Sequence, residues 1–289
     1  MTEQEPDALR RIRNILESPA YRRADQDIDF LNDNDARGAR LQLDFLKTDL
    51  NLRRQGIEQT IVVFGSTRIP DPVVATERVR ELGNAQKESP DDTAITEELR
   101  IAERILAKSN YYTVAREFAA LVAKAGKGPD DPRVTIMTGG GPGIMEAANR
   151  GAFDVGAKSI GLNITLPREQ YPNSYMSEEL AFSVHYFAIR KLHFLLRARA
   201  LVAFPGGFGT LDEVFETLTL VQTGTIEPLP VILVGEEFWR GAFDPDFLMS
   251  EGVISSADRQ LFTYADTADQ IWSEICEWHL IRGQTLLCD

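Results

Sequence analysis

Short apolar runs recur along the chain between longer stretches of mixed polarity. Runs rich in β-branched residues and bounded by glycine or proline indicate buried strands, because parallel strands covered on both faces carry few polar side chains. The predicted strands are Thr60–Phe64, Arg133–Thr138, Ser159–Asn163, Ala200–Phe204 and Leu229–Val234, with a shorter one at Leu180–His185.

Apolar residues at helical spacing fill the intervals between these strands. The predicted helices are Val73–Leu82, Ile95–Lys108, Tyr112–Ala125, Ile144–Asn149, Phe187–Arg199, Leu211–Thr223 and Thr267–Arg282. Strands that alternate with helices predict a parallel sheet with right-handed crossovers. We therefore expect an α/β protein with a Rossmann-like, doubly wound parallel sheet.

Two segments fall outside this alternation. Residues 1–56 are rich in Arg, Asp, Leu and Asn, with leucines at helical spacing from 36 to 54, and predict an N-terminal helical extension. A solvated arm is the alternative for residues 1–20. Residues 70–97 are rich in proline and acids and predict an insertion, with one helix at its start and a loop after it. The Rossmann-like domain is then expected at residues 57–289.

Composition narrows the classes of function. The formal net charge is −13, and this charge would repel a nucleic-acid backbone, although a single pocket can still hold a small phosphate. No run approaches the roughly 18 apolar residues of a membrane span, and the N-terminus is acidic rather than signal-like. Cys276, Cys288 and the three histidines show no metal-ligand spacing. We expect a cytoplasmic protein with no metal, no nucleic-acid partner and no membrane partner.

The strongest local motif is the run PGGFGTLDE that begins at Pro205, directly after an apolar strand. Gly206, Gly207 and Gly209 let the backbone approach a ligand closely. The helix start presents free N–H groups and a partial positive charge, which favour a phosphate. Thr210 can cap the helix and donate its hydroxyl to an anion. The alternative is a tight strand-to-helix turn without a ligand.

Two further glycine turns follow strands, at Gly65-Ser66 and at Gly139–Gly143, the latter reading GGGPG. In an open α/β sheet, such turns line the carboxyl edge where ligands bind. The spacing is not the G-x-G-x-x-G of dinucleotide sites, so an NAD-dependent oxidoreductase is a weaker alternative. No Gly-Lys-Ser/Thr sequence follows a glycine loop, so ATP hydrolysis is not expected.

Charged residues near these loops supply candidate chemistry. Arg190 and Lys191 lie on a predicted helix ahead of the PGG motif, and an arginine can fork onto a phosphate or stack on a base. A solvated face is the alternative for this pair. Glu213 and Glu216 share one helix face, so either can reach a ligand, although an acid in a first helical turn is also ordinary. His185 and His193 fit a packed or surface role better than a catalytic one.

These motifs resemble the Lonely Guy (LOG) family, historically labelled as possible lysine decarboxylases. The family's PGGxGTxxE motif matches Pro205–Thr210 with Glu213, and its upstream Arg-Lys pair matches Arg190-Lys191. Its GGGxxGxM run is similar to Gly139–Met145, in a slightly different register. The turn at Gly65-Ser66 resembles the family's first βα turn. The resemblance covers about residues 57–285 and leaves out the N-terminal extension.

The resemblance implies a phosphoribohydrolase without a cofactor that releases the base from AMP or from a cytokinin riboside 5'-monophosphate. It implies Arg190 and Glu213 as the catalytic pair. It further implies a substrate-binding set made of Gly65, Ser66, Gly140, Gly141, Gly143, Lys191, Gly206, Gly207, Gly209 and Thr210. It also implies a homodimer or higher homo-oligomer with the active site near the dimer interface.

The older label does not suit the sequence, since lysine decarboxylation needs a pyridoxal phosphate Schiff-base lysine and no motif identifies one. Two alternatives to the hydrolase stay open. One is a non-catalytic nucleotide- or molybdenum-cofactor-binding carrier, because such carriers resemble the family in fold. The other is a regulatory protein whose pocket has lost its chemistry.

Overall fold

The computed structural model describes residues 6–164, 171–284 and 286. By its contacts the chain forms two compact units, residues 1–47 and residues 48–289. The boundary falls inside helix α3 (Arg37–Arg54), whereas the sequence places the domain boundary at 56/57, in the turn after this helix. No helix among the described residues is long and apolar enough to cross a membrane.

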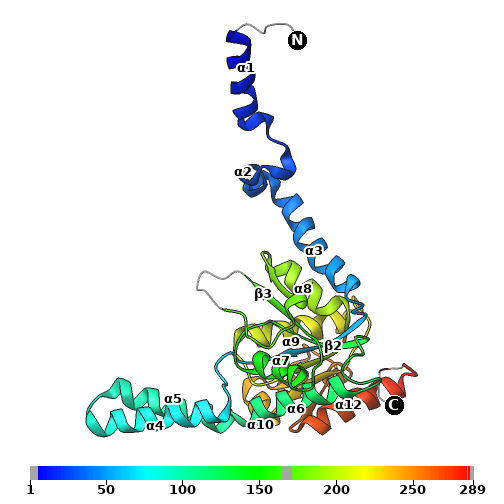
Figure 1. The fold of residues 1–289 in the computed structure, drawn as a ribbon. Helices are drawn as coiled ribbons and strands as arrows, with labels where there is room; N and C mark the ends of the chain where they lie inside the picture. Colours follow the sequence, from blue (N-terminus) through cyan, green and yellow to red (C-terminus); the bar gives the residue numbers. More distant parts are fainter. Residues whose placement is uncertain (1–5, 165–170, 285, 287–289) are drawn as a thin grey trace. The chain divides into compact units, whose positions relative to one another are not determined.

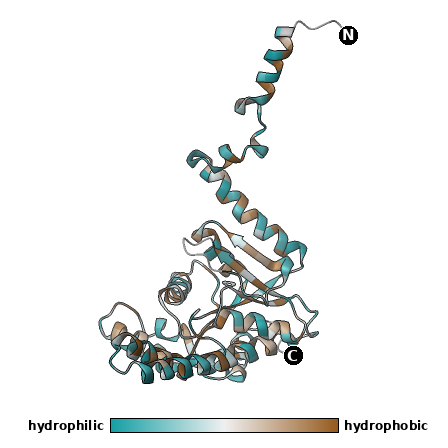
Figure 2. Ribbon diagram, turned by 60° about the vertical axis from the view of Figure 1, so that its left-hand side comes forward, coloured by the Kyte–Doolittle hydropathy of each residue, from teal (hydrophilic) through white to brown (hydrophobic). Residues whose placement is uncertain are grey.

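The first unit is helical. It contains α1 (Pro6–Glu17), α2 (Ile28–Asn32) and the first part of α3, joined by short 3₁₀ turns. Figure 2 shows bands of polar and apolar residues alternating along α1 and α3. The expectation of a helical segment is therefore confirmed over these residues, and α1 occupies most of the stretch for which a solvated arm was the alternative.

The second unit is built on one parallel sheet of seven strands in the order β4-β3-β2-β1-β5-β6-β7 (Figure 1). The strands are β1 (Gln59–Phe64), β2 (Val134–Thr138), β3 (Ser159–Ile164), β4 (Ala181–Val184), β5 (Ala198–Ala203), β6 (Val231–Val234) and β7 (Phe262–Ala265). Successive strands run outward from β1 to β4, and the chain then returns to place β5 on the other side of β1. This reversal confirms the predicted doubly wound fold and puts a topological switch point between β1 and β5.

Helices cover both faces of the sheet, and the central strands β1, β2, β5 and β6 contribute side chains to both of the resulting cores. Ile61 and Val63 of β1 belong to one core, while Val62 and Phe64 belong to the other. The first core is covered by α6 (Asn110–Lys124), α7 (Ile144–Asp154) and α12 (Ala268–Ile281). The second is covered by the end of α3 and by α8 (Phe187–Leu196), α9 (Phe208–Gln222) and α10 (Glu236–Ala242).

The predicted insertion at 70–97 differs from the expectation, because no long loop follows its first helix. Helix α4 (Pro72–Glu88) starts with Asp71 as its N-cap, and α5 (Thr93–Lys108) starts with Asp92 as its N-cap. The two helices pack on each other as a hairpin (Figure 1). The prolines and acids that suggested a loop therefore lie at helix starts, where proline and an acidic cap are favourable.

Two other expectations need correction. Helix α8 ends at Leu196, because Ala198 already pairs with Thr60 as the start of β5. Helix α9 begins at Phe208 with Gly207 as N-cap, so Thr210 lies within the first turn and does not cap the helix. Sequence patterns also missed α10, α11 (Pro245–Ser250) and β7, each of which is short.

Candidate active site

Three glycine turns meet at the carboxyl edge of the sheet, as the fold predicts. Ser66, in the turn after β1, links the other two turns through its backbone. Its N–H donates to the carbonyl of Pro205 at 3.0 Å, and its carbonyl accepts from the N–H of Ile144 at 3.1 Å. The turns after β1, β2 and β5 are thus held together at the switch point of the sheet.

A cavity of about 440 Å³ opens at this junction. Its lining residues come from the β1 turn, from α7, α8 and the start of α9, and are Phe64, Gly65, Ser66, Thr67, Arg68, Met145, Phe187, Arg190, Gly207, Gly209, Thr210, Asp212 and Glu213. The volume lies within the range usual for small-molecule sites. Of the predicted site residues, the cavity brings together Gly65, Ser66, Arg190, Gly207, Gly209, Thr210 and Glu213.

The first turn of α9 forms one wall of the cavity. The N–H groups of Thr210 and Leu211 both turn back to the carbonyl of Gly207. The N–H groups that open the helix, at Phe208 and Gly209, precede any intrahelical acceptor and carry the positive end of the helix dipole. The hydroxyl of Thr210 has no hydrogen-bond partner among the described residues. This wall can therefore donate several hydrogen bonds to an anion.

Glu213 lies one turn further along α9 and is only 7% exposed. Burial raises the pKa of its carboxyl to about 7, and the neighbouring charges of Lys191 and Arg190 oppose this rise while those of Glu216 and Asp212 add to it. Within the described part of the chain, no group donates a hydrogen bond to this carboxylate. A buried carboxyl with a pKa near neutrality is suited to accept and return a proton at physiological pH.

Arg190 of α8 reaches the same cavity from the opposite half of the sheet. Its Nε donates to the carbonyl of Leu162 at 2.7 Å and one terminal nitrogen donates to the carbonyl of Gly139 at 3.3 Å. A Cβ atom on Gly139 would clash with this guanidinium, so a side chain there would displace the arginine. Burial lowers the pKa of Arg190, and the charge of Glu213 opposes this effect. The remaining terminal nitrogen has no acceptor among residues 6–164, 171–284 and 286.

Lys191 does not line the cavity. Its ammonium lies 2.8 Å from Asp212, 2.7 Å from Glu216 and 4.0 Å from Glu213. Burial alone would lower the pKa of Lys191, but the hydrogen bonds to Asp212 and Glu216 outweigh it and the pKa is raised. The structure thus shows Lys191 engaged with three carboxylates of α9, where the sequence predicts a contact with substrate.

Gly140, Gly141, Gly143 and Gly206 also lie outside the cavity lining. The carbonyls of Gly140 and Gly141 accept hydrogen bonds from the side chains of Asn163 and Asn173, respectively. Gly143 has a φ of +70° and packs on the carbonyl of Ser66, and Gly206 packs on the side chain of Thr210. In this structure these four glycines shape the turns, and contacts with a substrate stay a prediction for them.

Six residues that line the cavity are not among the predicted site residues: Phe64, Thr67, Arg68, Met145, Phe187 and Asp212. Arg68 follows the predicted turn by two residues, and its N–H donates to the Ser66 hydroxyl oxygen at 3.1 Å. Phe187, at the start of α8, is 51% exposed and offers an apolar ring to the cavity. Met145 closes the glycine-rich run that begins at Gly139. A single cation or aromatic ring in a turn carries no periodic signal.

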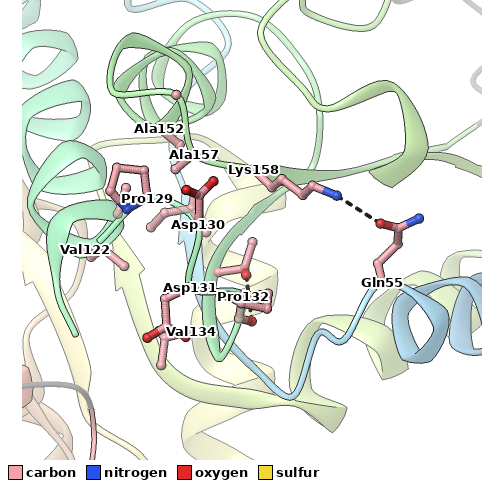
Figure 3. A pocket seen from close by; sticks show the side chains of 14 residues that line it. Gln55, Val122, Pro129, Asp130, Asp131, Pro132, Val134, Ala152, Ala157 and Lys158 are labelled. Carbon is pink, nitrogen blue, oxygen red and sulfur yellow. Dashed lines mark hydrogen bonds between the residues drawn. The ribbon is translucent and has the colours of Figure 1, made fainter. Parts of the chain in front are cut away.

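A smaller cavity of about 180 Å³ lies at the opposite, amino edge of the sheet (Figure 3). Lys158 at its rim donates to the Gln55 side chain at 3.0 Å and pairs with Glu179 at 2.7 Å. Asp131 at its base is held by Arg133 at 2.7 Å. These charged groups are satisfied by one another, and none of the glycine turns reaches this edge. We therefore place the candidate site at the carboxyl edge.

The fold and the site define a Rossmann-like α/β protein with an anion-favouring helix start beside a buried carboxylate. Residues 145–275 match the family model described as "Possible lysine decarboxylase". The cytokinin riboside 5'-monophosphate phosphoribohydrolase LOG of Oryza sativa subsp. japonica is 28% identical over 179 residues, which cover 59% of this chain and 68% of that protein. A phosphoribohydrolase of the same description from Arabidopsis thaliana is 29% identical over 147 residues, 50% of this chain and 66% of that protein. The chain is thus similar to members of the Lonely Guy family, as its motifs predict.

Solved structures are also similar to this chain. The molybdenum cofactor carrier protein of Chlamydomonas reinhardtii is 20% identical with a TM-score of 0.44, covering 78% of this chain and 99% of that protein. The molybdenum cofactor binding protein of Rippkaea orientalis is 18% identical with a TM-score of 0.41, covering 78% of this chain and 96% of that protein.

Proposed function

We propose that this protein hydrolyses the N-glycosidic bond of a nucleoside 5'-monophosphate, such as AMP or a cytokinin riboside 5'-monophosphate. The observation that carries the proposal is the placement of Glu213. This carboxyl is buried, has a pKa of about 7, and lines the same cavity as the open N-terminus of α9. The names of the curated relatives support the same reaction.

In the proposed complex the 5'-phosphate binds at the start of α9, against Gly207, Gly209 and Thr210. Binding the phosphate there fixes the sugar, so that C1' faces Glu213 one helical turn away. The ring of Phe187 offers an apolar surface against which a base can pack. Arg190 lines the same cavity and has one terminal nitrogen that can donate to a ligand.

Bond cleavage passes through a ribose with oxocarbenium character, as in other glycosyl hydrolyses. The Glu213 carboxylate stabilises this positive charge and takes a proton from the attacking water as the water oxygen bonds to C1'. The bond between C1' and the base nitrogen breaks with its electron pair on the base. The base then takes up one proton, so that one water is consumed and the products are free base and ribose 5-phosphate.

The test is a chromatographic assay of free base across a panel of nucleoside 5'-monophosphates, with the unphosphorylated nucleosides alongside. We expect release from at least one monophosphate and much less from its nucleoside. Glu213→Gln should lower the rate by about 100- to 10,000-fold, the usual loss for one acid–base group. Glu227→Gln, at an exposed position outside the cavity, is the matched control.

Two results would refute the proposal. One is tight binding of a nucleotide or cofactor without any release of base, which would favour a carrier. The other is near-normal turnover by Glu213→Gln, which would remove the carboxylate from the mechanism.

A further inference from the structure

Arg68 differs from the other basic side chains around the cavity because it is not engaged with the protein. Arg190 is bound to two carbonyls and Lys191 to carboxylates of α9. The guanidinium of Arg68 forms no ion pair or hydrogen bond with any of the described residues. Its backbone is nevertheless fixed, since its N–H donates to the Ser66 hydroxyl oxygen at 3.1 Å. Arg68 is exposed and lines the cavity, so its guanidinium is available to a ligand.

The charges of the cavity show why a ligand would need this arginine. Two arginines, Arg68 and Arg190, and two acids, Asp212 and Glu213, line the cavity, so their formal charges cancel. A phosphate monoester brings about two negative charges at neutral pH. The start of α9 supplies only about half a positive charge. With Arg190 facing Glu213, a phosphate at α9 depends on a further cation.

We propose that Arg68 is the side chain that recognises the phosphate dianion and so makes the site selective for monophosphates over nucleosides. This inference rests on the proposed function for its substrate, but the assignment of the anion contact to Arg68 stands on the structure of the cavity. Arginine suits the task because its planar guanidinium can donate two parallel hydrogen bonds to phosphate oxygens. Arg68 is then a binding and specificity residue and takes no part in proton transfer.

The test combines turnover with a binding measurement that needs no turnover. The variants are Arg68→Gln, which removes the charge, and Arg68→Lys, which keeps it without the planar fork. Arg78→Gln is the matched control, because Arg78 lies on the neighbouring helix α4, pairs with Glu98 at 3.1 Å, and does not line the site. Kd for ribose 5-phosphate is measured by titration calorimetry, and KM and kcat are measured for the best monophosphate and its nucleoside.

We expect Arg68→Gln to weaken ribose 5-phosphate binding and to raise KM for the monophosphate by about 10- to 100-fold, the usual effect of losing a charged hydrogen-bonding partner. The value of kcat and the kinetics on the nucleoside should change little, Arg68→Lys should fall between, and Arg78→Gln should match the wild type.

The outcomes separate this inference from the proposed function. If the wild type releases base but Arg68→Gln has an unchanged Kd and KM, the assignment of Arg68 is wrong and the proposed function survives. If no monophosphate is cleaved but ribose 5-phosphate binding depends on Arg68, the proposed function fails and the assignment stands. If the wild type does not bind ribose 5-phosphate, the assignment is overturned.

Discussion

Replacing Lys191 by methionine tests whether this lysine tunes Glu213 or binds substrate. The structure favours tuning, because the ammonium lies 4.0 Å from the Glu213 carboxylate and outside the cavity. Two unit charges at that distance interact by about 4 kcal/mol at an effective dielectric constant near 20, which corresponds to at most about three pKa units. Measured effects of a neighbouring opposite charge are about one to three units.

The direction of the effect follows from the same contacts. Lys191 lowers the pKa of Glu213, whereas Asp212 and Glu216 raise it. Without the ammonium the two acids also lose their counter-ion, so both changes move the Glu213 pKa upward from about 7. The carboxylate is the form that our mechanism requires. We therefore expect the acid limb of kcat/KM against pH to move upward by about one to three pH units, with recovery at alkaline pH.

The assay is base release from the best monophosphate over a range of pH, with Lys191→Arg as the control that keeps the charge. Circular dichroism checks that each variant is folded. An acid limb that stays where the wild type has it would refute the tuning role. A loss of activity that is equal at every pH, with weaker ribose 5-phosphate binding, would instead support the substrate contact that the sequence predicts.

Two further predictions concern stability and the glycine turns. The folded-state pKa of Glu213 is raised from 4.5 to about 7, so the wild type loses stability as pH rises through this window. Relative to the wild type, Glu213→Gln should therefore gain about 2 kcal/mol in free energy of unfolding between pH 5.5 and pH 8, measured by denaturant titration. An equal difference between the two proteins at both pH values would contradict this reasoning. Gly143→Ala should lower both thermal stability and base release, because its φ is +70° and the added Cβ would lie 2.4 Å from the Ser66 carbonyl oxygen. Gly156→Ala is the control, because Gly156 has a similar φ of +80° and no atom lies within 4 Å of the added Cβ. This variant should keep full activity while losing about 1–3 kcal/mol of stability to the same backbone strain. Loss of activity in both variants would argue against the contact with Ser66.

The sequence predicted most of the sheet because its central strands are continuous apolar runs that end in glycine or a turn. β7 escaped this reasoning, since it is a four-residue edge strand with only its two end residues buried. The second helix of the α4–α5 hairpin was anticipated, but the acids and prolines ahead of it were taken for a loop. Local composition does not separate a capped helix start from a loop, because the same residues favour both.

The cavity shows a similar division. Glu213, Arg190 and the start of α9 could be predicted because they belong to recognisable motifs. The role of Lys191 could not, since an Arg-Lys pair carries no information about which member turns toward the ligand and which toward a neighbouring helix. Arg68 could not be predicted either, because its importance lies in the absence of a partner among the described residues, which depends on tertiary structure.

The return of the chain from β4 to β5 has a consequence for biosynthesis. Helix α8 lies on this return path, so Arg190 is synthesised only after the four strands of the first half of the sheet. Glu213 on α9 is synthesised later still, after β5. A nascent or truncated chain that stops at β4 therefore holds two of the glycine turns but neither reactive side chain. Such fragments lack both side chains that the proposed hydrolysis requires.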